Sequence, residues 1–317
     1  MAQLQVAVIG VGPRGLTHLD ALRGFDDVTL AAVCDPSDAA RDAAAGEYGA
    51  VARYAGVDDM LDAETLDAAF VAAPAHLNAE AALPCLRRGV STLLEKPPGM
   101  SAAETVQLRD AAAESGAIGM VGWNRRFHPM IVAAREMVES RGPITQIVGE
   151  FHKSMSRLEA GGERHAKVVM DNMLYETPIH SIDLVRALAG SDVTQVHSVV
   201  RRAFSQYKDI HAALIEFQNG CVAQITSNYT TDARLERYEI HGRDVSAYLE
   251  GVRQGHVMGD GGRVEIERTG GNGTVEQARH FLDAVKAGKP VGPPAADLGE
   301  AVKTMELAGA IMAGLRD

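Results

Sequence analysis

Two short stretches contain side chains that could bind a ligand or transfer a proton, and the first contains a lysine. The β-prone run Val90–Leu94 is followed at once by Glu95-Lys96-Pro97-Pro98. Proline cannot continue a central strand and restricts the residue before it, so Lys96 lies at the strand's C-terminal end. Ligands of open parallel sheets bind outside the carboxyl ends of the strands. Lys96 therefore either faces a ligand or is a solvated loop lysine.

The second stretch places an acid four residues before a histidine. Thr177 and Pro178 are typical of an N-cap and a first helical residue. The helix that follows brings His180 and Asp183 into one neighbourhood. Because Pro178 disfavours helix at Thr177, we expect Glu176 in the segment that leads into the helix. Glu176 could orient the imidazole for general base catalysis; a capped helix with a buried, hydrogen-bonded histidine is the structural alternative.

A glycine-rich loop near the N-terminus predicts the element that would bring a cofactor to Lys96. The apolar run Val6–Ile9 predicts a buried parallel strand, and the stretch Leu16–Arg23 predicts a helix. Between them, the first glycine permits a tight turn, the second a close approach of a pyrophosphate, and the third close helix packing. The helix N-terminus attracts the phosphates. The predicted contacts in this loop are Gly10, Gly12, Pro13, Arg14 and Gly15.

An acidic residue after the second strand indicates which dinucleotide binds. The strand Thr29–Val33 ends at Cys34-Asp35, about 20 residues beyond the glycines, where a carboxylate accepts hydrogen bonds from the adenosine ribose. Asp35 would repel a 2′-phosphate, and no basic residue follows before Arg41. We therefore predict NAD, with NADP as an open alternative. A glycine-rich structural turn without a cofactor is the competing interpretation of the loop.

Strand and helix patterns continue to alternate up to residue 122. Short connections between such units are typical of a doubly wound, right-handed parallel sheet. The sequence therefore predicts an α/β Rossmann domain over residues 1–122. Its further expected elements are strands at Asp67–Ala72 and Ile118–Val121, and helices at His76–Arg88 and from the capping box Ser101-x-x-Glu104 to Gly116.

Beyond residue 122 the pattern changes to long strands that alternate apolar and polar residues. We predict a second domain, 123–317, of the α+β type with an open, mostly antiparallel sheet. Asn219-Gly220 is a hairpin signal, helices are expected at Thr274–Ala287 and Asp297–Leu315, and Gly255–Gly273 is expected to be mobile. Because the outer face of such a sheet needs covering, we expect a homodimer or homotetramer joined through it.

Composition limits the possible partners. The formal net charge is −11 and no Lys/Arg-rich block is present, which argues against nucleic acid. The cysteines Cys34, Cys85 and Cys221 are scattered and lack metal-ligand spacing, so we expect no disulfide or metal site and a reducing compartment. No leader pattern and no uncharged run of roughly 20 residues is evident. The prediction is a soluble, cytoplasmic protein that does not associate with membranes.

Taken in order, these motifs resemble those of the Gfo/Idh/MocA oxidoreductases, a family that contains glucose–fructose oxidoreductase, inositol dehydrogenase and many sugar dehydrogenases. The resemblance covers nearly the whole chain. It is carried by Ala7–Gly15, the Pro74 segment, Glu95-Lys96-Pro97, Asn124-Arg-Arg-Phe127, His180-x-x-Asp183 and Phe281–Gly288. It implies the Rossmann fold and the α+β domain predicted above.

The resemblance also implies roles for individual residues. Lys96 would contact the reacting hydroxyl or carbonyl and His180 would be the general acid/base, supported by the acid four residues earlier. Family members usually have Asp there, whereas this chain has Glu176. They often have His four residues after the third-strand proline, where this chain has Asn78. A cis peptide bond tends to precede the residue that is Pro97 here.

The remaining predicted site residues surround these groups. Further cofactor contacts are expected from Ala73, Pro74, Asn78, Glu95 and Lys96, and substrate contacts from Trp123, Arg125, Arg126 and Asp183. Surface charge is the alternative for the two arginines, and a core or junction position is the alternative for the tryptophan.

The leading functional hypothesis is hydride transfer between NAD(P) and a secondary alcohol, or its ketone, on a sugar or cyclitol. Two alternatives follow from the same resemblance. One is an NAD-dependent glycoside hydrolase, which oxidises its sugar transiently and releases no net NADH. The other is a non-catalytic regulator that uses the fold to sense its cofactor.

Overall fold

The computed structural model describes residues 3–49, 52–160, 167–267 and 270–316. The chain forms two compact units, and each contains two separate segments of the sequence. The first comprises Met1–Asn124 and Gly273–Val302, and the second Arg125–Asn272 and Lys303–Asp317.

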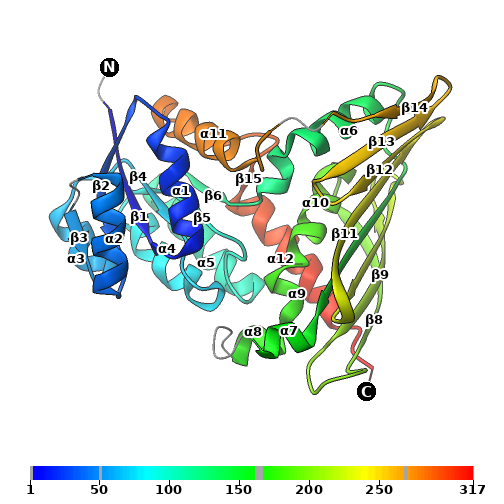
Figure 1. The fold of residues 1–317 in the computed structure, drawn as a ribbon, viewed down its shortest axis with the longest axis horizontal. Coiled ribbons are helices and arrows are strands. Elements are labelled where there is room, and N and C mark those ends of the chain that lie inside the picture. Colours follow the sequence, from blue (N-terminus) through cyan, green and yellow to red (C-terminus); the bar gives the residue numbers. More distant parts are fainter. Residues whose placement is uncertain (1–2, 50–51, 161–166, 268–269, 317) are drawn as a thin grey trace. The chain divides into compact units, whose positions relative to one another are not determined.

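The first unit is built on a seven-stranded sheet, counted over the described residues (Figure 1). Its order is β15-β6-β5-β4-β1-β2-β3, parallel throughout except for β15. This order confirms the predicted doubly wound Rossmann sheet. The strands are β1 Leu4–Ile9, β2 Val28–Cys34, β3 Ala52–Tyr54, β4 Ala68–Val71, β5 Ser91–Leu94, β6 Gly119–Val121 and β15 Ala296–Asp297.

Helices cover the central strands of this sheet, which is why those strands are apolar on both faces. The β4 residues 68–71 are fully buried. The predicted start of α5 is confirmed, because the Ser101 hydroxyl accepts a hydrogen bond from the Glu104 N–H and Gly116 ends the helix with φ +77°. The helices are α1 Pro13–Arg23, α2 Asp38–Tyr48, α3 Val57–Ala63, η1 Ala75–Leu77, α4 Asn78–Arg87, α5 Ala102–Ser115 and α11 Thr274–Ala287.

Helix α11 belongs to the first unit, although it lies far along the sequence. Phe281 of α11 meets Phe70 of β4 edge to face, with ring centroids 5.6 Å apart and both side chains fully buried. Asp27 accepts hydrogen bonds from Arg279 at 2.7 Å and from Lys286 at 2.8 Å. The predicted division into 1–122 and 123–317 is therefore corrected, since the chain returns to complete the covering of the first sheet.

The second unit is built on an eight-stranded sheet in the order β14-β13-β12-β11-β7-β10-β9-β8, again counted over the described residues. Only β7 and β10 pair in parallel, as expected for a mostly antiparallel sheet. The strands are β7 Gln146–Ser154, β8 Val193–Arg201, β9 Ile210–Phe217, β10 Val222–Asn228, β11 Thr230–Gly242, β12 Val245–Glu250, β13 Gln254–Gly259 and β14 Gly262–Glu265.

Strands β13 and β14 lie almost entirely within the stretch Gly255–Gly273, for which the sequence predicted mobility and no strand at Gly255–Gly259. Residues 268 and 269 of that stretch lie outside the described residues. A Cβ at Gly255 would come within 2.4 Å of Leu249 Cδ2, so this glycine permits close strand packing. Gly262, the first residue of β14, has φ +84°, which favours glycine.

Helix α10 covers one face of this sheet along β7 and β10 (Figure 1). The approach is close, because a Cβ at Gly149 of β7 would lie 3.3 Å from Val185 Cγ2. Among the described residues, no helix has the length and apolar character needed to cross a membrane. The other helices are η2 Asn124–Phe127, α6 Pro129–Glu139, α7 Met155–Ala160, α8 Lys167–Asp171, α9 Met173–Glu176, α10 Ile179–Ala189 and α12 Leu298–Met312.

Candidate active site

The glycine loop has the steric properties that a dinucleotide requires. Gly10 has φ +81°, and a Cβ there would lie 2.6 Å from the Ala72 carbonyl oxygen. A Cβ at Gly15 would lie 1.9 Å from the Gly10 carbonyl oxygen. At Gly12, which caps α1 without a side-chain hydrogen bond, nothing lies within 4 Å of the same position. The outer glycines are therefore needed for packing, whereas Gly12 leaves room for phosphates at the helix N-terminus.

Asp35 lies beside this loop, as predicted from its place after β2. Its Oδ2 accepts a hydrogen bond from the Val11 N–H at 3.0 Å, and its Oδ1 accepts one from the Ser37 N–H at 2.9 Å. Each carboxylate oxygen has a second lone pair that can accept from a ribose hydroxyl. Arg41 donates to the Asp35 backbone oxygen and pairs with Asp38. The donor and acceptor set fits NAD.

Glu95 is held in a buried cluster that connects α1 to the end of β5. Its Oε1 lies 2.9 Å from His18 Nε2 and also accepts from Arg14. Burial alone would raise the pKa of the Glu95 carboxyl, but the hydrogen bond and charge of His18, together with Arg14, lower that pKa to about 2. His18 was missed in the sequence. Its position three residues after Gly15, on the buried side of α1, is the signal that could have indicated it.

Lys96 protrudes from a backbone that is fixed on both sides. The side-chain amide of Asn78, itself buried, donates to the Glu95 carbonyl oxygen at 3.1 Å and to the Pro97 carbonyl oxygen at 3.0 Å. The Lys96–Pro97 peptide bond is cis. Glu95 and Pro97 are buried, whereas Lys96 is partly exposed. The lysine thus lies at the carboxyl end of β5 on a well-held turn.

Ala73 and Pro74 follow the neighbouring strand β4 and border the glycine loop. The Ala73 nitrogen would lie 3.1 Å from a Cβ built on Gly10. Pro74 begins a turn in which its carbonyl oxygen accepts from the Leu77 N–H at 2.7 Å. The structure therefore brings together, within the first unit, the predicted loop residues, Asp35, the β4 turn and Lys96.

In the second unit, Glu176 lies on a helix, which corrects the expected geometry. Helix α9 ends at Glu176, Thr177 and Pro178 keep right-handed helical backbone angles, and α10 begins directly afterwards. The Thr177 hydroxyl contacts the Glu176 and Lys153 side chains. Since the backbone stays near-helical, Glu176 and His180 are related by i,i+4 spacing and share one face.

The predicted arginine and aspartate residues form buried ion pairs within the second unit. Arg126 binds Asp183 in a two-pronged contact of 2.8 and 2.7 Å. Arg125 binds Glu236 in the same way, at 2.7 and 3.0 Å. Such forks fix the direction of both partners. Trp123, by contrast, is buried in the hydrophobic core of the first unit.

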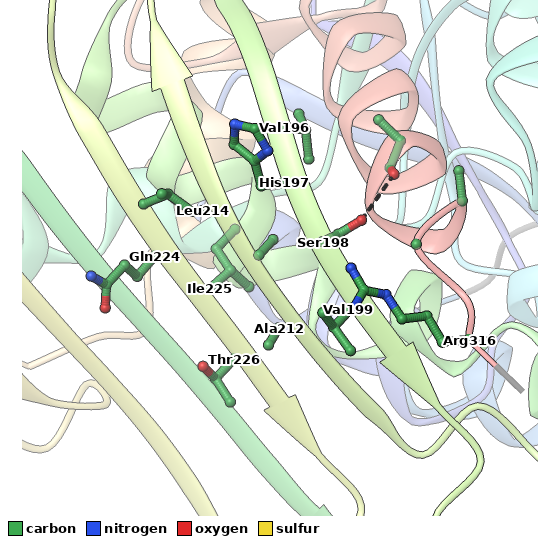
Figure 2. Close-up of a pocket in the computed structure, with 14 residues that line it drawn as sticks. Val196, His197, Ser198, Val199, Ala212, Leu214, Gln224, Ile225, Thr226 and Arg316 are labelled. Atoms are coloured by element: carbon green, nitrogen blue, oxygen red, sulfur yellow. Dashed lines mark hydrogen bonds between the residues drawn. The ribbon is translucent and has the colours of Figure 1, made fainter.

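A surface groove of about 690 Å³ lies elsewhere, across β8, β9 and β10 beside the C-terminal end of α12 (Figure 2). His197, Leu214 and Thr226 are among its lining residues, and the Ser198 hydroxyl donates to the Ala310 carbonyl oxygen at 3.4 Å. None of the predicted site residues lines this groove. The candidate catalytic groups therefore remain those of the glycine loop, the end of β5 and α10.

Comparisons with known proteins agree with these features. Residues 4–123 match the family described as "Oxidoreductase family, NAD-binding Rossmann fold", and residues 131–248 match the "GFO/IDH/MocA C-terminal domain". The chain is 26% identical over 266 residues to scyllo-inositol 2-dehydrogenase (NAD(+)) of Bacillus subtilis (strain 168), covering 80% of this chain and 76% of that one.

Two solved structures have the same fold. UDP-N-acetylglucosamine 3-dehydrogenase from Acidithiobacillus ferrooxidans superposes with a TM-score of 0.84 at 21% identity, covering 99% of this chain and 98% of that one. Levoglucosan dehydrogenase in complex with NADH and L-sorbose superposes with a TM-score of 0.85 at 20% identity, covering 99% and 97%. With both family models matched in order and the glycine loop and Asp35 suited to NAD, the chain belongs to the Gfo/Idh/MocA family of NAD-binding oxidoreductases.

Proposed function

We propose that this protein is a dehydrogenase that transfers a hydride between NAD and a secondary alcohol of a sugar or cyclitol, or the corresponding ketone. The named relatives support this substrate class, since they are dehydrogenases of an inositol, a nucleotide sugar and an anhydrosugar. A substrate of this class is a polyhydroxylated ring.

The observation that carries the proposal is the frame around Lys96. Glu95 and Asn78 hold the backbone next to it, and both belong to the same unit as the glycine loop. A fixed ammonium group can donate a hydrogen bond to an oxygen that develops negative charge in the transition state. We assign this role to Lys96 at the reacting hydroxyl or carbonyl.

His180 is the proposed general acid/base, and Glu176 supports it. Glu176 lies one helical turn before His180, where a carboxylate can orient an imidazole and favour its protonated form. A positioned proton-transfer group contributes roughly 10²–10⁴-fold to rate. The nicotinamide ring of bound NAD supplies the hydride acceptor or donor. Arg126 and Arg125 keep α10 and β11 in place through Asp183 and Glu236.

Kinetics of two variants test the assignment. We expect Lys96→Ala and His180→Ala to lose turnover on any active substrate while NADH affinity, measured by fluorescence titration, changes less than about threefold. The matched control is Lys289→Ala, at an exposed position, which should behave as wild type. Turnover at the wild-type level in either of the first two variants would contradict the proposal.

The substrate is to be found by assaying NAD⁺ and NADP⁺ against inositols, hexoses, amino sugars and nucleotide sugars. Continuous growth of absorbance at the nicotinamide band over many turnovers is the expected result. Release of an aglycone without net NADH would indicate a glycoside hydrolase instead. NAD binding without turnover on any polyol would indicate a regulator.

We also propose that copies associate through the outer face of the eight-stranded sheet. Leu214 of β9, Val222 of β10 and Met258 of β13 are exposed there at 41%, 37% and 41%. Light scattering after gel filtration should give a dimer or tetramer, and Leu214→Glu should lower the mass. A monomeric wild-type protein would contradict this.

A further inference from the structure

A lysine on β7 faces the side of the second sheet that α10 covers. Ile147, Gly149 and Phe151 are buried on that side, and alternation places Lys153 with them. The Cβ position of Gly149 lies 3.6 Å from Ser181 Cβ of α10, which identifies the covered face. The Lys153 side chain is only 20% exposed. A charged group at such a position loses hydration and needs a partner.

Irregular strand pairing accompanies this lysine. Thr230 of β11 pairs with Ser154 of β7, but the next pair joins Leu235 to His152, so Lys153 alone stands opposite residues 231–234. Bulges of this kind re-aim side chains and occur near active sites. The Thr231 hydroxyl donates to the Lys153 carbonyl oxygen at 3.2 Å and fixes the backbone there.

The partner of Lys153 is Glu176. Lys153 Nζ lies 3.1 Å from Glu176 Oε2 and also donates to the Thr177 hydroxyl. The Glu176 side chain is 23% exposed, so the pair is largely withdrawn from water.

We infer that Lys153 is a positioning residue, which holds the Glu176 carboxylate directed along the face that carries His180. The inference rests on the proposed function. A glutamate has one more rotatable bond than the aspartate expected at this place, so its carboxylate needs a further contact to be fixed. Lys153 and Thr177 supply that contact from two different elements, β7 and the α9–α10 connection.

Loss of the ammonium group should impair the chemical step more than substrate binding. Without it, the carboxylate can rotate towards water, and His180 loses its oriented neighbour. Displacement of a catalytic arrangement by about 1 Å can lower the rate roughly 10²-fold. We therefore expect Lys153→Met to lower kcat by roughly 10- to 100-fold while KM and the NADH dissociation constant change less than about threefold.

A set of variants tests this. Lys153→Arg keeps the charge and should recover most of kcat, and Lys167→Met removes an 82% exposed lysine of α8 and should leave kcat unchanged. In a Glu176→Gln background, Lys153→Met should cause little further loss, since the carboxylate that it holds is gone. If Lys153→Met does not fold, as judged by circular dichroism, Lys153→Gln takes its place in the comparison.

Two outcomes would overturn the inference. One is a kcat at the wild-type level in Lys153→Met. The other is a loss of kcat that is equal in Lys153→Met and Lys153→Arg, and that is just as large when Lys153→Met is made in the Glu176→Gln background. Failure of the proposed function is separate, because it would appear as retained turnover in Lys96→Ala or His180→Ala. If those two variants are inactive and Lys153→Met is fully active, only the role of Lys153 is refuted.

Discussion

Replacing His211 by leucine is expected to remove a large part of the protein's sensitivity to mild acid. His211 lies on β9, is fully buried, and is the register partner of Ser227 on β10. Neither ring nitrogen makes a hydrogen bond of normal geometry to another described residue, and neither does the Ser227 hydroxyl. Burial first, and the charge of Lys208 second, lower the pKa of His211 to about 4, against a weaker opposing effect of Asp209.

The sign and size of the effect follow from proton linkage. The unfolded histidine has a pKa of about 6.5, so between pH 6.5 and 4 the unfolded state binds more protons than the folded state. Stability is therefore complete above pH 6.5 and falls as the pH decreases towards 4. The difference between the two pKa values corresponds to about 3 kcal/mol, most of which is lost by pH 4.5.

Urea unfolding of wild type and His211→Leu between pH 7.5 and 4.5 measures this. Far-UV circular dichroism is the suitable probe, because the only tryptophan, Trp123, reports on the first unit whereas His211 lies in the second. Across this range, the free energy of unfolding of the variant should fall by about 2–3 kcal/mol less than that of wild type. At pH 7.5 it should be at least as stable, since leucine leaves no unpaired ring nitrogen.

The exposed His197 on β8 provides the control, and His197→Leu should keep the wild-type pH dependence. Acidic groups with lowered pKa values do not obscure the comparison. Glu95, for example, loses its stabilising effect only between pH 4.5 and about 2, below the range measured. Parallel pH profiles for wild type and His211→Leu would refute the assignment of a buried, neutral His211.

Two further predictions concern the cofactor. Gly12→Ala should fold normally but bind NADH at least about tenfold more weakly by fluorescence titration, because its Cβ would occupy the space left for phosphate. Gly15→Ala should instead unfold at a lower urea concentration, because its Cβ would clash with the Gly10 carbonyl oxygen. Asp35→Ser should raise the ratio of NADP to NAD affinity by at least about fivefold, since it removes a negative charge beside Arg41; an unchanged ratio would contradict the ribose assignment.

Much of the first unit could be predicted from local patterns. Apolar strands, the glycine loop and the cap at Ser101 are each encoded within a few residues, and the helix Thr274–Ala287 was predicted with its observed limits. The sheet that this helix covers could not be predicted, because the apolar face of an amphipathic helix does not identify the surface on which it packs. The contacts Phe70–Phe281 and Asp27–Arg279 join segments more than two hundred residues apart in the sequence.

The structure of the glycine-rich stretch 255–273 could not be predicted for a different reason. Glycines are frequent both in mobile loops and where strands approach closely. At Gly255 the second cause applies, because the Leu249 side chain fills the space that a Cβ would need. Only the packing of β12 against β13 distinguishes the two, and this packing is not visible in local sequence.

In the candidate site too, residues could be predicted from their type, whereas their contacts with distant residues could not. Lys96 and His180 could be singled out because their residue types and neighbours suit the chemistry. The side chains that hold the adjacent carboxylates come from distant positions: His18 lies 77 residues before Glu95, and Lys153 lies 23 residues before Glu176. The alternation of buried residues along β7 could have indicated Lys153, because it places this lysine on the covered face of the strand.

Each candidate catalytic residue therefore has a nearby carboxylate that a side chain from another part of the sequence holds in place. Glu95 precedes Lys96 and is buried with His18 and Arg14, and its pKa of about 2 keeps it ionised at any pH suitable for an assay. Glu176 precedes His180 by one turn and is tied to Lys153. Because Glu95 does not titrate near neutrality, a transition in kcat/KM between pH 5 and 9 should not arise from Glu95, so Glu95→Gln should change the height of the pH profile and not its midpoint. A shifted midpoint would show that Glu95 exchanges a proton during turnover and would overturn its purely positioning role.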